Sequence, residues 1–301
     1  MTRIFSDEEL DLLARRPRDQ IEDAVARSPG EALETFERWV RRHTAFTEGF
    51  YRWVATIQGW LYERYGPEGL ATTADLDSRL AHASPGSSAR DGDLEALCEA
   101  VREVLGEPTR TGAVLARWDA VESHLRTVHD HHRDRVSAYL SHVYRSHGVD
   151  ELEACLRYSG ERTLLRWMPE DLSRPPEVRL RTWVGMLHGN FARIRIEEDD
   201  EKFTIIQDPC GTCTRQIEAG ACGPPLDLAV VAERHRITYG EGDMPVYRTH
   251  VAVMHYLMPI EKSGVPWPVV SCPMGRGTGP CQIALYKDPA RTPESLAARV
   301  A

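Results

Sequence analysis

The chain has 301 residues, which is enough for two domains with hydrophobic cores of their own. Hydrophobic residues make up 42% of it, a fraction that is usual for a soluble globular protein. The formal net charge of −9 argues against nucleic acids and anionic membrane surfaces as partners, because both require a basic protein surface.

The N-terminal sequence and the cysteines predict a cytoplasmic protein. The first residues, MTRIFSDEELDLL, contain no basic stretch followed by an apolar core, so they do not predict a signal peptide. No apolar run reaches the roughly 18 residues of a membrane-spanning helix. Cytoplasmic thiols stay reduced. The chain has seven cysteines, and most of them follow residue 209, so their clustering predicts metal or thiol chemistry rather than disulfides.

The first part of the chain, residues 1–170, has the periodicity of an all-α helical bundle. Ser6 and Glu9 have the spacing of a capping box at the start of a first helix. Apolar and aromatic residues recur at spacings of three and four around 46–60 and along 112–147, which predicts helices with buried faces. Residues 66–92 are rich in Gly, Pro, Ser and Thr and predict a loop.

His129 and His132 lie about one turn apart on the longer of these helical segments. They could share a metal ion, but a di-iron site in a bundle also needs Glu-x-x-His pairs, and the sequence contains none. Polar packing or ligand contact inside the bundle is the better interpretation.

Residues 171–301 predict a smaller mixed α/β domain, which places the whole chain in the α+β class. A helix is expected to end at His188, with Gly189 as a left-handed C-cap. Alternating segments on both sides of the acidic run 197–201 predict an antiparallel hairpin. The acidic run is expected at its solvated tip, with Glu198 a candidate general base if a metal ion lies near it.

The hairpin is followed by Asp208-Pro-Cys-Gly-Thr-Cys213, which contains a CxxC motif. In a thioredoxin-like site the first cysteine lies at the N-terminus of a helix, which lowers its pKa, but only a short segment separates this motif from Gly220. A tight turn that directs two thiolates at one metal ion fits better. Cys210 and Cys213 are therefore predicted metal ligands.

His250 and His255 are the predicted nitrogen ligands, in an otherwise apolar segment. Residues five apart share a face of a helix only where the helix is irregular, which the flanking Pro245 and Pro259 favour. The sequence leaves open whether the other late cysteines join the site: Cys222, Cys272 and Cys281.

The segment between Cys272 and Cys281 has glycines at three alternate positions. Backbone N–H groups of such a loop can form a nest that binds an anion. A phosphate-binding P-loop would also need GK[ST] and a following helix, and both are absent from this sequence. Arg276 is the candidate substrate-binding residue, because its planar guanidinium matches a carboxylate or phosphate. A flexible connection is nevertheless the better interpretation of this segment, and Arg276 would anchor an anion only if the loop closes over the site.

Together these residues predict a metal-dependent enzyme that acts on a small organic molecule by hydrolysis or lyase chemistry. Zinc, or another divalent transition metal, is the expected cofactor, and His188, Glu198 or Asp208 would transfer protons. One alternative is a metal-free enzyme with Cys210 as nucleophile. The other is a binding or sensor protein in which closed Cys/His ligands hold a structural zinc.

Overall fold

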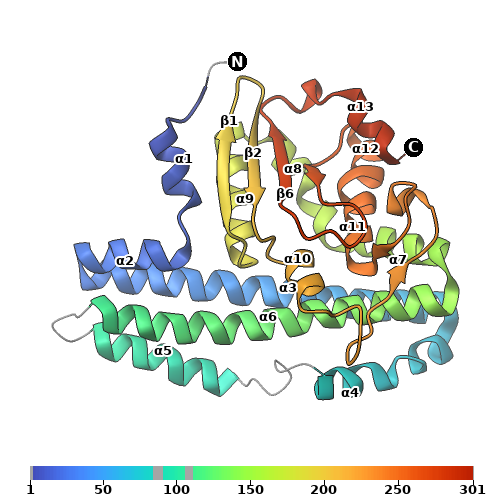
Figure 1. Cartoon of the computed structure of the whole chain (residues 1–301), viewed down its shortest axis with the longest axis horizontal. Helices are drawn as coiled ribbons and strands as arrows, with labels where there is room; N and C mark the ends of the chain where they lie inside the picture. The colour runs from blue at the N-terminus through green and yellow to red at the C-terminus, as the bar shows by residue number, and fades with distance from the viewer. Residues whose placement is uncertain (1–2, 84–90, 106–110, 301) are drawn as a thin grey trace.

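The computed structural model of the protein describes residues 3–83, 91–105 and 111–300. Long helices form one layer, and a small antiparallel sheet with helices of its own stands against that layer (Figure 1). The α+β class predicted from the sequence is confirmed. Among the helices of the described residues, none combines the length and apolarity that a membrane crossing requires.

The helical layer follows the predicted periodicity. Ser6 and Glu9 form the expected capping box at the first helix, and Pro29 begins the third at a first-turn position that tolerates proline. Helices α3 and α6 run side by side along the length of the molecule (Figure 1). The helices of this layer are α2 (Pro17–Arg27), α3 (Pro29–Ala71), α4 (Ala74–Ala83), α5 (Asp91–Leu105), α6 (Thr111–His147) and α7 (Val149–Arg162). Helix α1 (Asp7–Ala14) lies beside β1 at the edge of the sheet (Figure 1).

The predicted loop at 66–92 is wrong in its first part. Helix α3 continues to residue 71, with a break in its helical geometry at Gly66, whose φ is 70°. Pro67 explains the break, because proline restricts the residue before it and cannot donate a helical hydrogen bond. Helix α4 then follows, and residues 84–90 of the predicted loop lie outside the described residues.

The rest of the chain alternates short helices with short strands. Its helices are α8 (Met168–Ser173), α9 (Pro176–Gly189), α10 (Cys213–Glu218), α11 (Thr249–Val251), α12 (Met258–Ser263) and α13 (Glu294–Ala297). Its strands are β1 (Ile194–Glu198), β2 (Lys202–Gln207), β3 (Val230–Val231), β4 (Met244–Pro245), β5 (Val269–Ser271) and β6 (Cys281–Tyr286). A π-helical turn, η5 (Ala252–Leu257), joins α11 to α12. Shorter 3-10 turns are Leu164–Trp167, Arg236–Thr238, Val246–Arg248, Pro289–Arg291 and Ala298–Val300.

The main sheet has the strand order β1-β2-β6-β5, and every neighbouring pair is antiparallel. The hairpin predicted around the acidic run is confirmed as β1 and β2, with Ile194 opposite Gln207 and Glu198 opposite Phe203. Strands β3 and β4 form a separate two-stranded sheet.

One group of buried apolar side chains joins the helical layer to the sheet. Ile57 of α3 and Leu140 of α6 are fully buried in it, together with Phe203 and Ile205 of β2. The division of the chain at residue 170 stays a prediction, and this core contains side chains from both sides of it.

Two glycines let α9 approach α3 closely. A Cβ at Gly185 would lie 2.4 Å from Nη1 of Arg42, and a Cβ at Gly189 would lie 2.4 Å from Cδ2 of Phe46. The left-handed residue after this helix is Phe191, with φ 59°, and Gly189 does not have a positive φ. The C-cap predicted at Gly189 is therefore wrong, and the glycine at this position serves the contact between the helices.

Candidate metal centre

The strand order of the main sheet gathers four cysteines at one of its ends. Because β6 runs antiparallel to both neighbours, its first residues lie beside the last residues of β2 and β5. Gln207 is opposite Cys281, and Ser271 is opposite Gln282. The cysteines at this end are Cys210 after β2, Cys213 at the start of α10, Cys272 after β5 and Cys281 at the start of β6.

Three of these thiols form a compact, buried group. The Sγ atoms of Cys210, Cys213 and Cys281 all lie within 4.8 Å of one another, and those of Cys210 and Cys213 are 3.9 Å apart. The thiol of Cys272 lies outside this group, but it interacts with those of Cys213 and Cys281, and the interaction with Cys213 raises the pKa of Cys272. The group of three buried cysteines could hold a metal ion, and a fourth thiol is at its side.

A tight turn positions the CxxC motif. A Cβ at Gly211 would lie 1.9 Å from the carbonyl oxygen of Asn190, so only glycine fits where the turn passes the end of α9. Two arginines hold this turn between neighbouring elements. Nη1 of Arg133, on α6, donates to the carbonyl oxygen of Thr212 at 3.3 Å. Nη1 of Arg215, on α10, donates to the carbonyl oxygen of Asn190 at 3.2 Å.

Arg248 is a buried cation beside the thiols, with 1% of its surface exposed. Its Nη1 donates to the carbonyl oxygens of Pro273 and Gly275 at 2.6 Å each, and its Nη2 donates to that of Gly277 at 2.9 Å. Nη2 also lies 3.8 Å from Sγ of Cys213. The loop between β5 and β6 therefore turns carbonyl oxygens toward a cation, whereas an anion-binding nest at its glycines would turn N–H groups toward an anion.

The thiols and Arg248 favour negative charge at Cys213. Hydrogen bonds from the thiols of Cys210, Cys272 and Cys281 lower the pKa of Cys213 well below its ordinary value, and the Arg248 guanidinium adds to this effect. The same contacts raise the pKa of Cys281, with Cys210 the largest cause. The group is thus suited to hold at least one thiolate next to a fixed positive charge.

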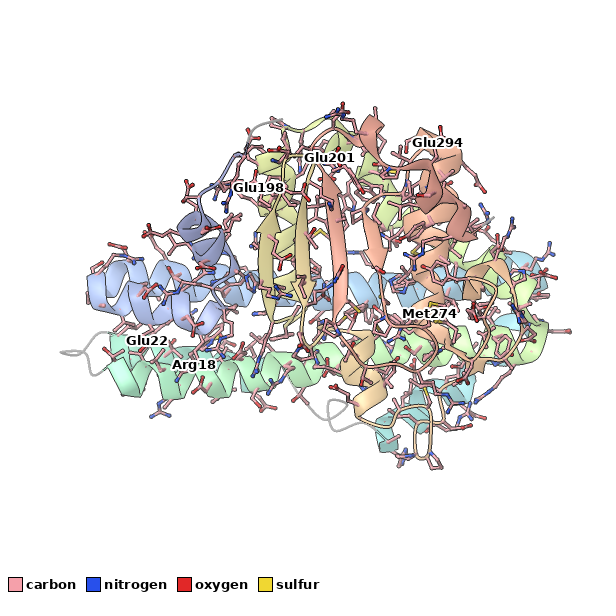
Figure 2. The ribbon with its side chains drawn as sticks, turned by 45° about the horizontal axis from the view of Figure 1, so that its top comes forward. Arg18, Glu22, Glu198, Glu201, Met274 and Glu294 are labelled. Atoms are coloured by element: carbon pink, nitrogen blue, oxygen red, sulfur yellow. The ribbon has the colours of Figure 1, made fainter. Side chains whose placement is uncertain are left out.

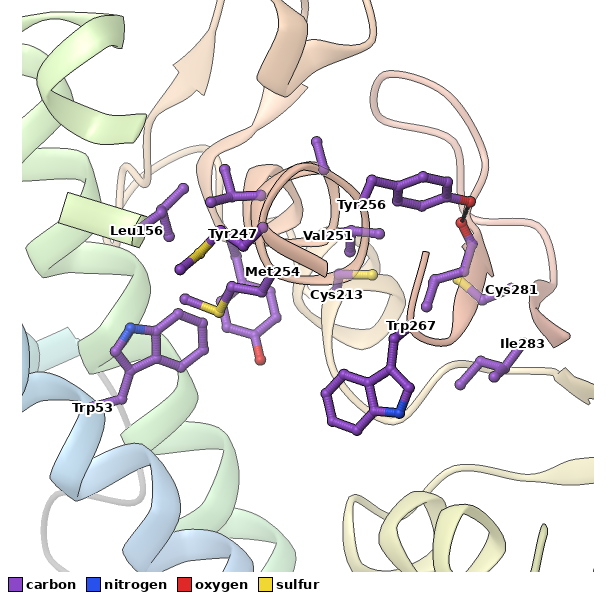
Figure 3. Close-up of a cluster of buried hydrophobic side chains, with 14 of the residues drawn as sticks. Trp53, Leu156, Cys213, Tyr247, Val251, Met254, Tyr256, Trp267, Cys281 and Ile283 are labelled. Carbon is purple, nitrogen blue, oxygen red and sulfur yellow. Dashed lines mark hydrogen bonds between the residues drawn. The ribbon is translucent and has the colours of Figure 1, made fainter. Parts of the chain in front are cut away.

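A cavity of about 710 Å³ opens beside these cysteines, and all four of them line it. Trp53, Trp167, Trp183 and Tyr247 supply much of the aromatic part of its wall, and Met254 lines it as well. Figure 3 shows Trp53, Tyr247 and Met254 gathered to one side of Cys213. The indole N–H of Trp53, a residue that is 9% exposed, has no hydrogen-bond partner in the part of the chain that the structure describes.

His250 and His255 line the same cavity, but their ligand atoms are not part of the three-cysteine group. The irregularity expected in their segment is present, because His255 lies in the π-helical turn η5. Winding with i to i+5 hydrogen bonds brings residues five apart toward one side. The two ring centroids are accordingly 6.0 Å apart.

Both imidazoles present a free acceptor nitrogen. Nδ1–H of His250 donates to the carbonyl oxygen of Tyr247 at 2.5 Å, and Nδ1–H of His255 donates to that of Trp267 at 3.1 Å. Burial lowers the pKa of His250, and it lowers the pKa of His255 to about 3. Each ring is therefore neutral at physiological pH, and its Nε2 has a lone pair that no described residue engages.

The other predicted site residues do not line this cavity. His188 donates from Nε2 to the carbonyl oxygen of Leu13 at 3.3 Å. Arg276 is exposed and pairs with Asp243 at 2.9 Å. Asp208 is exposed after the end of β2.

Glu198 lies at the opposite end of the sheet from the cysteines. Its carboxylate accepts hydrogen bonds from the backbone N–H groups of Ile4 and Phe5, at 2.6 and 2.9 Å, and pairs with Lys287 at 2.7 Å. Figure 2 shows the separation between Glu198 at this end and Met274 in the β5–β6 loop at the other. This carboxylate therefore fastens the N-terminal segment to the sheet.

Comparisons with protein-family models, with curated proteins and with solved structures found no match for this chain. Fold alone would not establish a function in any case, because function depends on the chemistry of the site.

Proposed function

We propose that Cys210, Cys213, Cys272 and Cys281 bind one zinc ion and that the adjoining cavity binds a small, largely apolar organic molecule. The observation that carries this proposal is that all four thiols form part of the wall of one cavity, which three tryptophans, two phenylalanines and one tyrosine also line. The zinc would fix the shape of that wall, and the tryptophans and histidines would recognise the ligand.

The spacing of the thiols supports a single ion. Sulfur atoms about 2.3 Å from a tetrahedral zinc are about 3.8 Å from one another. The Sγ atoms of Cys210 and Cys213 are 3.9 Å apart, close to that value. A cluster of several iron atoms would need the thiolates farther apart, because its inorganic core occupies the space between them.

The surroundings of the thiols also suit a charged metal complex. Four thiolates around a divalent ion carry a net negative charge, and burial of a net charge is costly unless an opposite charge is near. Arg248 supplies that opposite charge 3.8 Å from Sγ of Cys213. Its hydrogen bonds to the β5–β6 loop also fix the segment that connects Cys272 with Cys281.

Four protein ligands favour a binding protein over an enzyme. A structural zinc site is closed by four ligands, whereas a catalytic one keeps a position for water or substrate. The cavity itself offers acceptors at Nε2 of His250 and His255 and a donor at the indole N–H of Trp53. A planar, uncharged molecule with a hydrogen-bond donor on one edge and an acceptor on another would match these groups.

The partial exposure of Cys272 favours a second candidate function. This cysteine is less buried than the other three and lies outside the compact group. With three thiolate ligands the ion would keep a fourth position on the cavity side, and bound water there would become acidic. His250 or His255 would then accept a proton, as in the metal-dependent hydrolase or lyase expected from the sequence.

Metal analysis and cobalt substitution test the proposal. Protein purified without added metal is expected to contain one zinc per chain, and after exchange for Co²⁺ its visible spectrum should report four sulfur ligands. Cys272→Ala should change that spectrum, while the matched control Cys222→Ala should leave it unchanged. A spectrum with three sulfurs that responds to azide would favour the enzyme. Metal-free protein that folds normally would contradict both candidates.

A further inference from the structure

A second cavity, of about 550 Å³, is lined by residues of α1, α2, α3 and α9. Its lining contains five arginines and three carboxylate side chains. Two of the arginines are neutralised locally, because Arg15 pairs with Asp23 and Arg27 pairs with Glu31. The cavity thus has an excess of positive charge in a protein whose net charge is −9.

The other three arginines have no carboxylate within ion-pair distance in the described parts of the chain. Arg38 donates only to the amide oxygen of Gln20, at 3.4 Å. The guanidinium carbon of Arg42 lies 5.3 Å from the ring centroid of Trp39. Arg181 lines the same cavity from α9. Its guanidinium carbon lies 5.3 Å from the ring centroid of Phe5, and its charge also acts on the carboxylate of Glu9.

The fold holds Arg42 in this position. The absence of a side chain at Gly185 leaves room for its guanidinium, since a Cβ there would lie 2.4 Å from Nη1. Burial, and then repulsion from Arg38, lower the pKa of Arg42. An unpaired cation that is partly desolvated beside a second cation is unfavourable unless an anion joins them.

His188 contributes shape to this cavity and no charge. Burial lowers the pKa of His188 to about 4, so the ring is neutral at physiological pH. It lies edge-on to Trp39, with the ring centroids 5.7 Å apart. The cavity therefore combines three guanidinium groups that have no ion pair among the described residues with the aromatic rings of Trp39 and His188.

We propose that this cavity is a binding site for a small organic oxyanion, a carboxylate or a phosphate. Arg38, Arg42 and Arg181 hold its oxygens, and Trp39 packs against its organic part. Guanidinium groups suit this role because their planar N–H pairs match both kinds of anion. The site is separate from the cysteine cavity, and its occupation does not depend on a metal ion.

Titration calorimetry of the full-length, metal-loaded protein tests this site, with citrate and inorganic pyrophosphate as the two probes. At least one probe is expected to bind at one site per chain, and the stronger of the two identifies the anion class. Arg42→Gln should weaken that binding by at least about tenfold. The matched control is Arg41→Gln, because Arg41 pairs with Glu37 on the same helix and does not line the cavity.

Arg41→Gln should change the affinity less than about twofold, as expected for an exposed pair. Arg181→Gln gives an independent measurement, because Arg181 is exposed on α9 and its replacement leaves the core intact. Absence of binding by both probes at millimolar concentration would overturn the proposal. Equal weakening by the substitutions of Arg41 and Arg42 would also overturn it, since that result would mean nonspecific attraction to a charged surface.

Discussion

Arg248 connects the thiols to the loop between β5 and β6. Its two Nη atoms serve three carbonyl oxygens of that loop and lie beside a sulfur atom. Those carbonyl groups turn toward the buried guanidinium, so its loss leaves three partly buried acceptors without this donor. A buried charge with several strong hydrogen bonds is difficult to replace.

We expect Arg248→Met to lower the free energy of unfolding by about 3–5 kcal/mol and to weaken metal binding. The matched control is Arg276→Met in the same loop, whose exposed pair with Asp243 should contribute less than about 1 kcal/mol. Urea unfolding and metal content of the purified variants provide both measurements. Equal stability of the two variants would contradict the role assigned to Arg248.

For single residues, the sequence predicted the metal-binding character of the CxxC turn, but it did not predict which groups contact Arg248, Glu198 and His188. Cys210 and Cys213 could be found because their spacing is local and thiolates are common metal ligands. Arg248 was missed because it bonds to backbone carbonyl groups far along the chain, although an arginine in the apolar segment 246–258 was a usable signal. We predicted proton transfer for Glu198 and His188. In the structure both side chains bond to the N-terminal segment, and the sequence alone does not show that this segment folds against them.

The first strand is tied to the N-terminal segment through Glu198. Burial alone would raise the pKa of this carboxyl group, but hydrogen bonds from Lys287 and from the N–H groups of Ile4 and Phe5 lower the pKa below its ordinary value of 4.5. A folded-state pKa that is lowered adds stability above pH 4.5, and that stability is lost as the pH falls toward the folded value.

We therefore expect Glu198→Gln to lower the free energy of unfolding by about 1–3 kcal/mol at neutral pH. The difference between variant and wild type should shrink as the pH falls below 4.5, because the wild-type carboxylate becomes protonated there. Glu197→Gln is the control, since Glu197 is exposed and pairs with Arg195, whose side chain is exposed too. A pH-independent difference, or an equal effect of the control, would exclude this account.

Whole elements were predicted well where a periodic pattern was long. The repeats along 112–147 and the alternation around 197–201 gave α6 and the β1–β2 hairpin, because burial on one face imposes its period on the sequence. Helix α4 was missed because the composition of residues 66–92 resembles a loop, while Leu76 and Leu80 are buried in the fold. The tertiary contacts of these two leucines, and not the local composition, explain why this segment is helical.

At the scale of the molecule, the cysteines depend on a sheet whose order no local pattern specifies. Cys281 meets Cys210 only because β6 inserts between β2 and β5. Such pairing joins segments that are distant in the chain, so the sequence could leave only an open question about Cys272 and Cys281. The same sheet shares its core with α3 and α6.

Because of this shared core, we expect chelation of the metal to destabilise both layers together. The apparent melting temperature should fall by more than about 10 °C, as expected for a loss of several kcal/mol in a chain of this size. Far-ultraviolet circular dichroism, which reports the helices, and tryptophan fluorescence should give coincident unfolding curves before and after chelation. Separate transitions would show instead that the two layers fold independently.

The close contact of α9 with α3 has a geometric consequence for both cavities. Arg42 and Phe46 are neighbours on one face of α3, and they fill the spaces left by Gly185 and Gly189. Arg42 borders the arginine-lined cavity and Phe46 borders the cysteine-lined one. The distance between α3 and α9 therefore affects the shape of both cavities. A side chain added at Gly185 or Gly189 would push the two helices apart and change both cavities together.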